Sequence, residues 1–383
     1  MEKGKKRVFV ALSGGVDSAV AAFLLKKATP NNFEKLFGRP TPEGFRGYDV
    51  TGVFIKIWQP EFIECTWKED RLDAMRVAVS LGIPFKEVDL SEEYKREVID
   101  DMLSMYKKGF TPNPDVLCNR HIKFGALWKW AKERGADYIA TGHHARVESI
   151  LEKKSPLGNS VPKWGMLRGV DEDKDQSYFL WQLTQGDLSH ILMPVGEMDK
   201  GKVRLLAKKH NLPVAQKPDS QGLCFVGHIN MSDFLQKFID TKPGRVVLQE
   251  GTEVGTHNGS ELYTIGQRHG FAVFEKGEVG APSYVSGVNV KENTITVSKN
   301  KNDILQETAT LNSINWIRKE GTEGKISCQS RYRQSPQACT ILEEEKEKVI
   351  VHFEKPQIAV PGQSLVFYEG AKCLGGGIIM QDS

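Results

Sequence analysis

The most constraining feature of this sequence is the junction over residues 8–28, where the apolar run VFVAL passes through SGGVDS into an apolar helical segment. A strand, a glycine-rich turn and a helix in this order bring backbone N–H groups and a helix N-terminus toward one point, which favours an anion. The turn contains Ser13, Gly14, Gly15, Asp17 and Ser18. Glycines admit phosphate oxygens and hydroxyls donate to them, so we expect a phosphate here. Asp17 either caps the helix or helps to hold Mg²⁺.

Short apolar runs then alternate with helical patterns up to about residue 142, which predicts an α/β fold with a doubly wound parallel sheet. Strands are expected near 8–12, 49–57, 85–90 and 137–141. Helices are expected near 17–28, 68–82, 92–108 and 119–134, the second with Leu72, Met75 and Val79 on one face. Ligands of such sheets lie beyond the carboxyl ends of the strands. The turns SGGVDS and TGHHA both follow strands at that edge.

The chain of 383 residues is too long for one ordinary core. A helical stretch is expected at roughly 174–210, after which short strand-like runs separated by turns predominate. We therefore expect an α/β domain over residues 1–225, a small β-rich central domain over 226–299 and a C-terminal β-barrel over 300–383. The long connection at 29–48 is either a mobile lid or an inert insertion.

The charge balance, the absence of a membrane-length apolar run and the cysteine spacing limit the partners, the compartment and the metal sites that this chain can have. Lys and Arg total 52 against 49 for Asp and Glu, so any nucleic-acid site must be a local basic patch. An apolar run of membrane-spanning length is absent, and the first strand begins within about seven residues, which predicts a cytoplasmic protein with no membrane partner. The six cysteines show no C-x-x-C pair, which argues against a zinc or iron–sulfur site, so metal ligands are not expected.

Two cysteines stand in unusual surroundings. Cys118, in TPNPDVLCNRHIKFG, comes just before a helix expected to begin near Asn119, and a thiol at a helix N-terminus is reactive because its pKa is lowered. We expect a pKa of about 7 for Cys118, which would already make much of the thiol a thiolate. A still lower pKa would bring no gain, because the nucleophilicity of a thiolate falls as its pKa falls. Cys224, in PDSQGLCFVGH, lies between Gly222 and Gly227, either in a bending loop or in a buried strand. Both cysteines could alternatively be core residues.

The motifs resemble those of a known family. SGGVDS is similar to the PP-loop of ATP pyrophosphatases, which split ATP between the α- and β-phosphates. The ordered set SGGVDS, TPNPDVLCNRHIKFG, ADYIATGHHAR, DKDQSYFL, DSQGLCFVG, YTIGQRHG, RYRQ, PGQSLVFY and LGGGII resembles the tRNA-specific 2-thiouridylases of the MnmA/TrmU family. Departures are the insertion at 29–48, Ile55 where Met is frequent and His144 where Tyr is common.

This resemblance implies an enzyme, a tRNA-uridine 2-sulfurtransferase that uses ATP with Mg²⁺ and receives sulfur from a carrier or persulfide-donor protein. Cys224 would carry the persulfide, and Cys118 would be the nucleophile that releases the sulfur. Residues 1–225 would be the PP-loop catalytic domain. The ATP site would comprise Ala11, Leu12, Ser13, Gly14, Gly15, Val16, Asp17, Ser18, Ile55 and Gly142. The tRNA site would comprise Asn113, Pro114 and Asp115 at the target base, with His143, Lys174, Asp175, Gln176, Arg331, Tyr332 and Gln363.

The chemistry agrees with this division of labour. A uridine carbonyl becomes reactive toward sulfur once its oxygen is adenylated and can leave as AMP, and two thiols can hold and release sulfur by exchange. The base must be flipped into a pocket. Phosphate contacts are expected from Arg120, Lys123, Arg146, Lys174, Arg331 and Arg333. Cys65, Cys328, Cys339 and Cys373 are expected to be spectators.

Three alternatives remain at this point. An ATP pyrophosphatase that forms amide bonds would need no cysteine pair. A thiolase with an iron–sulfur cluster would need cysteines spaced for the cluster. An RNA-binding protein with an inactive nucleotide fold would release no AMP.

Overall fold

The computed structural model describes residues 4–37, 40–41, 44–62, 67–150, 163–219, 230–274, 283–319, 326–345 and 348–381. Cys65 and Cys224 lie outside these ranges. Among the described residues, no helix is long and apolar enough to cross a membrane.

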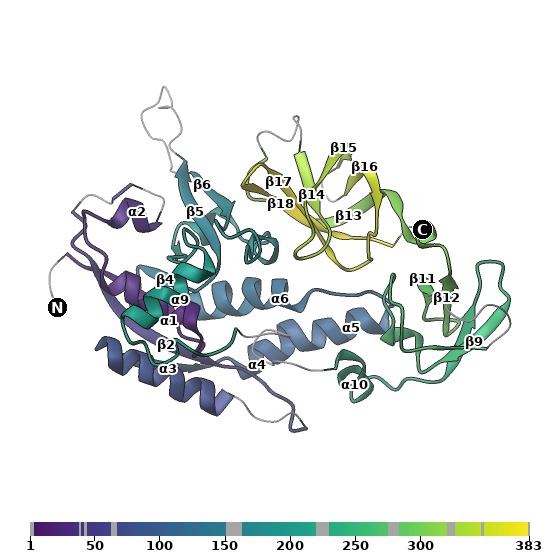
Figure 1. Cartoon of the computed structure of the whole chain (residues 1–383), viewed down its shortest axis with the longest axis horizontal. Coiled ribbons are helices and arrows are strands. Elements are labelled where there is room, and N and C mark those ends of the chain that lie inside the picture. Colours follow the sequence, from purple (N-terminus) through teal and green to yellow (C-terminus); the bar gives the residue numbers. More distant parts are fainter. Residues whose placement is uncertain are drawn as a thin grey trace.

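The N-terminal part is built on a five-stranded sheet in the order β3-β2-β1-β4-β7 (Figure 1). Its strands are β1 (Lys6–Ala11), β2 (Tyr48–Lys56), β3 (Phe85–Asp89), β4 (Tyr138–Ala140) and β7 (Ile191–Leu192). All four pairings are parallel. Successive residues of β1 enter different cores, since Val8 and Val10 belong to one apolar cluster and Phe9 to another. The sheet is therefore covered on both faces, which confirms the doubly wound fold.

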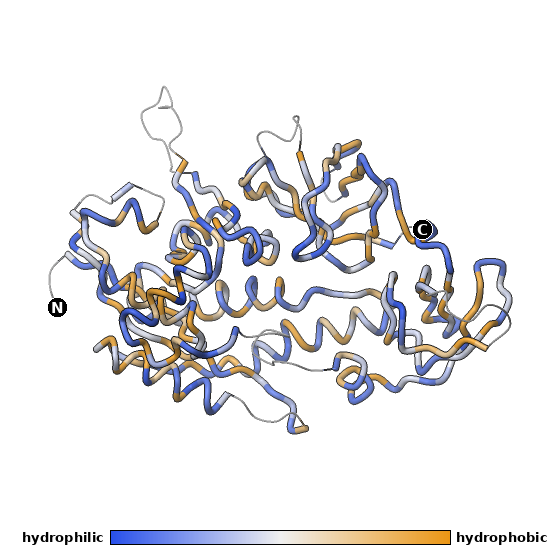
Figure 2. The backbone as a smooth tube through the Cα atoms, viewed as in Figure 1, coloured by the Kyte–Doolittle hydropathy of each residue, from blue (hydrophilic) through white to orange (hydrophobic). Residues whose placement is uncertain are grey.

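Two groups of helices provide that cover. One group is α1 (Val16–Lys26), α2 (Phe33–Phe37), α3 (Trp67–Leu81) and α9 (Lys200–Lys209). The other contains two long helices with π-helical centres. The first runs through α4 (Ser91–Tyr94), η1 (Lys95–Asp100) and α5 (Asp101–Lys107), and the second through α6 (Pro114–Leu117), η2 (Cys118–Ala126) and α7 (Leu127–Glu133). Hydrophobic and hydrophilic residues alternate along α5 and α6 (Figure 2), as one-sided burial requires.

The expected face of α3 was wrong. Ala74, Val77, Ala78 and Leu81 are its buried residues, whereas Leu72 is 46% exposed and Val79 is 78% exposed. The small alanines let α3 lie close to α1 and β2, with which it is in contact. The close packing of α3 against α1 and β2 therefore buries the face with small side chains and leaves the expected face, with its larger side chains, exposed.

The expected helix over 174–210 was also largely wrong. This stretch contains the 3₁₀ turn η3 (Ser177–Phe179), the short α8 (Gln185–Leu188), β7 and only then α9. Gly196 shows why the chain is irregular here, because a Cβ atom at this position would lie 1.9 Å from the carbonyl oxygen of Ala145. The segment follows a neighbouring strand closely and cannot coil away from it.

The connection at 29–48 carries aromatic residues into the core. The ring of Phe33 lies 4.8 Å from that of Phe37 and 4.6 Å from that of Phe45, measured between centroids. Tyr48 packs edge-on against Phe37 at 5.6 Å. These rings belong to the same apolar cluster as Val8 and Val10. The described residues of this connection thus extend the core.

Two β-rich parts follow. The central one has α10 (Met231–Gln236), β8 (Gly244–Val247), β9 (Glu253–His257), the 3₁₀ turn η4 (Ser260–Leu262), β10 (Ala272–Val273), β11 (Tyr284–Asn289) and β12 (Thr294–Ser298), with η5 (Lys301–Ile304) beyond. The last has β13 (Gln306–Trp316), β14 (Ile326–Gln329), β15 (Gln337–Glu344), β16 (Val349–Gln357), β17 (Ser364–Glu369) and β18 (Lys372–Ile379). Strand β13 pairs with both β16 and β18, which closes a barrel. The expected β-rich central region and C-terminal barrel are confirmed.

A hairpin without a counterpart in the sequence analysis joins the barrel to the α/β part. Strands β5 (Ala145–Ile150) and β6 (Lys163–Arg168) pair with each other, and β6 also pairs with β18. Figure 1 shows this hairpin beside the barrel, with α5 reaching toward the central part. The barrel is therefore attached to the α/β part by a strand pairing.

Candidate functional site

The glycine-rich turn between β1 and α1 has a conformation that requires glycine. Gly14 has φ +74°, and a Cβ atom there would lie 2.5 Å from the carbonyl oxygen of Asp70. The hydroxyl of Ser18 accepts a hydrogen bond from the Ser13 N–H at 3.2 Å and donates to the Gly15 carbonyl at 3.0 Å. Two serines therefore brace the turn from inside.

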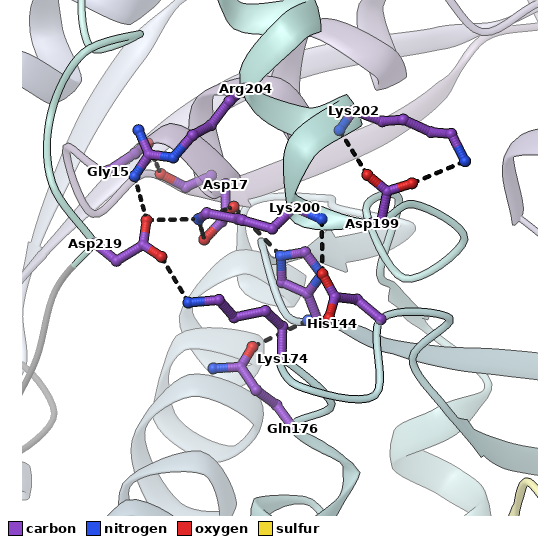
Figure 3. Close-up of polar contacts among 12 residues, drawn as sticks. Gly15, Asp17, His144, Lys174, Gln176, Asp199, Lys200, Lys202, Arg204 and Asp219 are labelled. Carbon is purple, nitrogen blue, oxygen red and sulfur yellow. Dashed lines mark hydrogen bonds and ion pairs between the residues drawn. The ribbon is translucent and has the colours of Figure 1, made fainter. Parts of the chain in front are cut away.

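Asp17 lies in the first turn of α1 and is held by a distant lysine. Both its carboxylate oxygens accept hydrogen bonds from Lys200 Nζ, each at 2.7 Å, and His144 Nε2 lies 3.4 Å away (Figure 3). Burial raises the pKa of Asp17, but the hydrogen bonds from His144 and Lys200 outweigh it and lower that pKa. Gly15 occupies the N-cap position of α1, where no side chain makes a capping hydrogen bond. Asp17 lies inside the first turn and therefore does not hold the capping position considered for it.

The remaining residues expected at the nucleotide lie at the same sheet edge. Ile55 is buried near the end of β2, and Leu12 and Val16 also point into the core. Because these side chains are buried, only the backbone groups at these positions can contact a ligand. Gly142 follows β4, and a Cβ atom there would lie 2.6 Å from the backbone nitrogen of Ser18. Only glycine lets the β4 turn approach α1 so closely.

Cys118 is fully buried, with 0% exposure, on the helix that starts at Pro114. Asn113 caps this helix by accepting a hydrogen bond from the Val116 N–H at 3.4 Å. The expected start near Asn119 was wrong, because the Asn-Pro pair supplies a cap and a first helical residue. Cys118 thus lies one turn inside the helix, beyond the N–H groups that would favour a thiolate.

Three parts of the chain meet just before this helix. The backbone N–H of Thr111 donates to the Pro361 carbonyl at 2.9 Å. Gln363 Nε2 donates to the carbonyls of Thr111 and Pro112 at 2.9 and 3.0 Å. The hydroxyls of Thr111 and Thr264 lie 2.9 Å apart. The barrel and the central part therefore both hold the segment that leads to Asn113, Pro114 and Asp115.

Barrel residues also approach the Cys118 helix through an aromatic pair. The rings of Tyr332 and Phe179 have centroids 4.6 Å apart, and the Phe179 carbonyl accepts a hydrogen bond from Asn119 at 3.1 Å. Arg331 is exposed, and the guanidinium of Arg333 lies 5.3 Å from the Tyr332 ring. The contacts of Tyr332 and Phe179 therefore bring the chain segment that carries both arginines toward the Cys118 helix.

The other residues expected at tRNA are engaged within the protein. Thr141 Oγ1 lies 2.7 Å from His143 Nδ1, and Lys123 Nζ lies 3.4 Å from its Nε2. Burial, followed by the charge of Lys123, lowers the pKa of His143 well below its ordinary value. Lys174 donates to Asp219 at 2.8 Å. Asp175 accepts from the backbone N–H groups of Gly169 and Ser177, and Gln176 accepts from the His144 N–H.

Parts of the expected basic set are likewise paired. Arg120 bonds Asp187 at 2.9 Å, and Arg146 lies 3.5 Å from Glu197. Both pairs are half-buried. These two arginines are therefore available to phosphate groups only at the expense of an existing pair, unlike the exposed Arg331.

Sequence reasoning missed an ion-pair cluster beside the PP-loop. Lys200 bridges Asp17 and Asp219, and Arg204 and Lys174 also bond Asp219 (Figure 3). Two signals could have pointed to it. Asp219 belongs to the DSQGLC motif, and Lys200 and Arg204 have the i, i+4 spacing that places both on one face of α9.

Family models cover most of the chain. A model described as a tRNA methyl transferase HUP domain matches residues 6–37 and 44–228. A tRNA methyl transferase PRC-barrel domain matches 232–299, and an aminomethyltransferase beta-barrel domain matches 306–379. The first match leaves out 38–43, so most of the supposed insertion at 29–48 lies inside the family pattern.

The chain is also similar to named relatives along nearly its whole length. The chain is 41% identical to the tRNA-specific 2-thiouridylase MnmA of Bacillus subtilis, over 97% of this chain and 94% of that protein. It is 39% identical to the MnmA of Vibrio cholerae O395, over 98% and 96%. The structure of the U34-tRNA thiolase NcsA of Methanococcus maripaludis with its [4Fe-4S] cluster aligns with TM-score 0.35 and 19% identity, over 62% of this chain and 66% of that one. The near-complete match to the curated relatives shows that this chain belongs to the tRNA-specific 2-thiouridylase (MnmA) family.

Proposed function

We propose that this protein replaces the 2-oxygen of the wobble uridine of tRNA with sulfur at the expense of ATP. Its relatives along nearly the whole chain are named for 2-thiolation of tRNA. One structural observation carries the proposal further. Gly142 contacts the N-terminus of the PP-loop helix, and the next residue, His143, contacts Lys123 on the helix of Cys118. The loop suited to a nucleotide and the helix bearing a thiol thus meet through two consecutive residues.

The reaction balances with two cysteines and no metal redox step. The uridine O2 attacks the α-phosphate of ATP, and pyrophosphate leaves. Mg²⁺ bound together with ATP would neutralise charge on the phosphates. A donor protein has meanwhile loaded Cys224 with a persulfide. The Cys118 thiolate attacks the Cys224 sulfur, which forms a disulfide between the two residues and frees hydrosulfide. Hydrosulfide attacks C2 of the adenylated base, AMP leaves, and a thiol reductant restores both cysteines.

Each part of the chain has its own role in this reaction. Residues 11–18, Ile55 and Gly142 bind ATP, largely through backbone groups because several of these side chains are buried. Asn113, Pro114 and Asp115 face the target base, and Arg331 and Tyr332 contact tRNA directly. His143, Lys174, Asp175, Gln176 and Gln363 shape the tRNA face through the internal contacts described above. The domains span 1–225, 226–299 and 300–383, and the enzyme works in the cytoplasm.

Burial of Cys118 sets a condition on this mechanism. A thiol with 0% exposure cannot reach a base in solution. Docking of tRNA must therefore move side chains away from Cys118, and the flipped uridine occupies the space so opened. The cost of flipping, a few kcal/mol, is offset by phosphate contacts to the basic residues of the tRNA face.

The test is thiolation of an unmodified tRNA transcript with ATP and a persulfide source. We expect 2-thiouridine and stoichiometric AMP with the wild type. Cys118→Ser and Cys224→Ser should form no 2-thiouridine, whereas Cys373→Ala, which alters a buried barrel cysteine, should retain activity. Full activity in both serine variants would favour a pyrophosphatase that joins other substrates. Absence of AMP in the wild type would indicate an RNA-binding protein without catalysis.

A further inference from the structure

Asp219 is the focus of an unusual concentration of positive charge. Its Oδ1 lies 2.9 Å from Lys200 Nζ and 2.5 Å from the guanidinium of Arg204, and its Oδ2 lies 2.8 Å from Lys174 Nζ. Figure 3 shows Arg204 and Lys174 approaching the carboxylate from opposite sides, with Lys200 between Asp219 and Asp17. One carboxylate therefore receives cations from two separate segments of the chain.

Lys200 connects this cluster to the PP-loop. Its ammonium group donates to both oxygens of Asp17, on the first turn of α1, as well as contacting Asp219. The side chain is only 12% exposed, whereas those of Asp17 and Asp219 are 31% and 27% exposed. Lys200 is thus held beside the glycine-rich turn by two carboxylates that are accessible to solvent and to a ligand.

The charges in the cluster are not balanced. Lys200, Lys174 and Arg204 face the carboxylates of Asp17 and Asp219, which leaves an excess of one positive charge. A phosphate chain carries more negative charge than a carboxylate and accepts several charge-assisted hydrogen bonds. A nucleotide at this turn would also bring its phosphates toward two carboxylates, which is unfavourable unless the shared cations change partner.

Asp219 is ionised throughout the physiological range. Burial raises its pKa, but the hydrogen bonds from Lys174 and Lys200 outweigh burial and hold that pKa well below its ordinary value. Its competition for the cations is therefore present at every pH at which the enzyme would work.

We propose that Lys200 and Arg204 bind the β- and γ-phosphates of the nucleotide, and that Asp219 holds both side chains until the phosphates displace its Oδ1. The inference rests on the proposed use of ATP and adds the phosphate ligands and their intramolecular competitor. Lys174 keeps its bond to Oδ2 during the exchange. Asp219 is a positioning residue, because it acts on the phosphates only through the two cations.

The experiment measures equilibrium binding of inorganic pyrophosphate and of AMP, separately and without tRNA, by calorimetry. Lys200→Met should weaken pyrophosphate binding about tenfold or more, since a hydrogen bond to a charged group is worth roughly 1.5–3 kcal/mol. AMP affinity should stay within about twofold, since AMP lacks the β- and γ-phosphates. Arg204→Met should act in the same direction and serves if Lys200→Met does not fold.

Asp219→Asn separates this proposal from a structural role. Removing the competing charge should tighten pyrophosphate binding by several-fold, even if the midpoint of thermal unfolding falls. The matched controls are Asp199→Asn and Lys202→Met, which alter an exposed ion pair of 2.8 Å on the same helix. Asparagine also preserves the cap that Asp199 provides to α9. Both controls should bind pyrophosphate like the wild type.

Two results would overturn the inference: unchanged pyrophosphate affinity in Lys200→Met and Arg204→Met, or affinity in Asp219→Asn no tighter than in the wild type. Neither depends on thiolation. A wild type that binds pyrophosphate in this pattern but forms no 2-thiouridine would refute the proposed function and leave the exchange standing. If the wild type thiolates tRNA but Asp219→Asn leaves pyrophosphate affinity unchanged, the proposed function stands and the exchange at Asp219 is refuted.

Discussion

Gln363 of the C-terminal barrel holds the backbone of Thr111 in the segment that leads into the helix of Cys118. Its side-chain nitrogen donates at 2.9 Å to the Thr111 carbonyl and at 3.0 Å to that of Pro112. Together with the bond from the Thr111 N–H to the Pro361 carbonyl, this amide fixes the barrel relative to the Cys118 helix. A domain remote in the sequence in this way determines where Asn113, Pro114 and Asp115 lie.

Gln363→Ala should destabilise the protein by about 1–3 kcal/mol, since two hydrogen bonds are lost. Gln363→Glu should be worse, because a carboxylate cannot donate to the two carbonyls and repels them. We expect both variants to raise KM for tRNA and to leave ATP affinity unchanged, as measured by steady-state thiolation and calorimetry. Equal stability of the alanine and glutamate variants would contradict this account of the contact.

Gly142→Ala should damage the nucleotide site. The new methyl group would lie 2.6 Å from the Ser18 nitrogen and 2.7 Å from the Asp17 carbonyl carbon, so α1 or the β4 turn must shift. We expect a loss of stability of about 1–3 kcal/mol and clearly weaker ATP binding by calorimetry. Gly186→Ala is the control, since its nearest neighbour is Thr184 Oγ1 at 3.6 Å. Normal ATP affinity in Gly142→Ala would count against the close approach.

His143 should make stability depend on pH. Burial and Lys123 lower its folded-state pKa, so between the folded and unfolded values the unfolded chain binds a proton that the folded chain does not. Stability therefore falls as pH drops through the unfolded pKa, by about 1.4 kcal/mol for one such proton between pH 7.5 and 5.5. Urea unfolding should show that His143→Gln loses less stability over this interval than the wild type. An identical loss in both proteins would place the titration elsewhere.

Phe33→Ala should destabilise the fold without altering the chemistry. The Phe33 side chain is fully buried among Phe37, Phe45 and Tyr48, and removing such a ring costs about 3–5 kcal/mol. Thermal unfolding should report this loss, while ATP affinity well below the transition stays normal. Phe274→Ala, at a site 55% exposed, should change stability by less than about 0.5 kcal/mol. Weakened ATP binding in Phe33→Ala would instead assign the 29–48 connection to the nucleotide site.

Several features followed from local sequence because their causes are local. The alternation of apolar runs and helical patterns specified the parallel sheet, and the glycines of SGGVDS specified a turn with positive φ at Gly14. The short strands after residue 240 specified β structure. Cap chemistry was equally readable at Asn113, although it was overlooked, and this misplaced Cys118 relative to the helix N-terminus.

Other features depended on partners distant in the chain. The exposure of Leu72 and Val79 arose because alanines allowed α3 to approach α1 and β2 more closely than leucine and valine would. The β5–β6 hairpin became an edge of the barrel sheet only when β18 was beside it. The free energy of such packing and strand-pairing contacts depends on which surfaces meet in the folded protein. A short stretch of sequence does not contain that information.

By itself the sequence determined the α/β and β classes, the phosphate-suited turn and the family, because turns, apolar periodicity and motif order are properties of neighbouring residues. The tertiary structure alone decided that Lys200 joins Asp17 to Asp219 and that Gln363 holds Thr111. These contacts form between groups far apart in the chain, so their existence depends on the folded packing that brings the groups within hydrogen-bond distance.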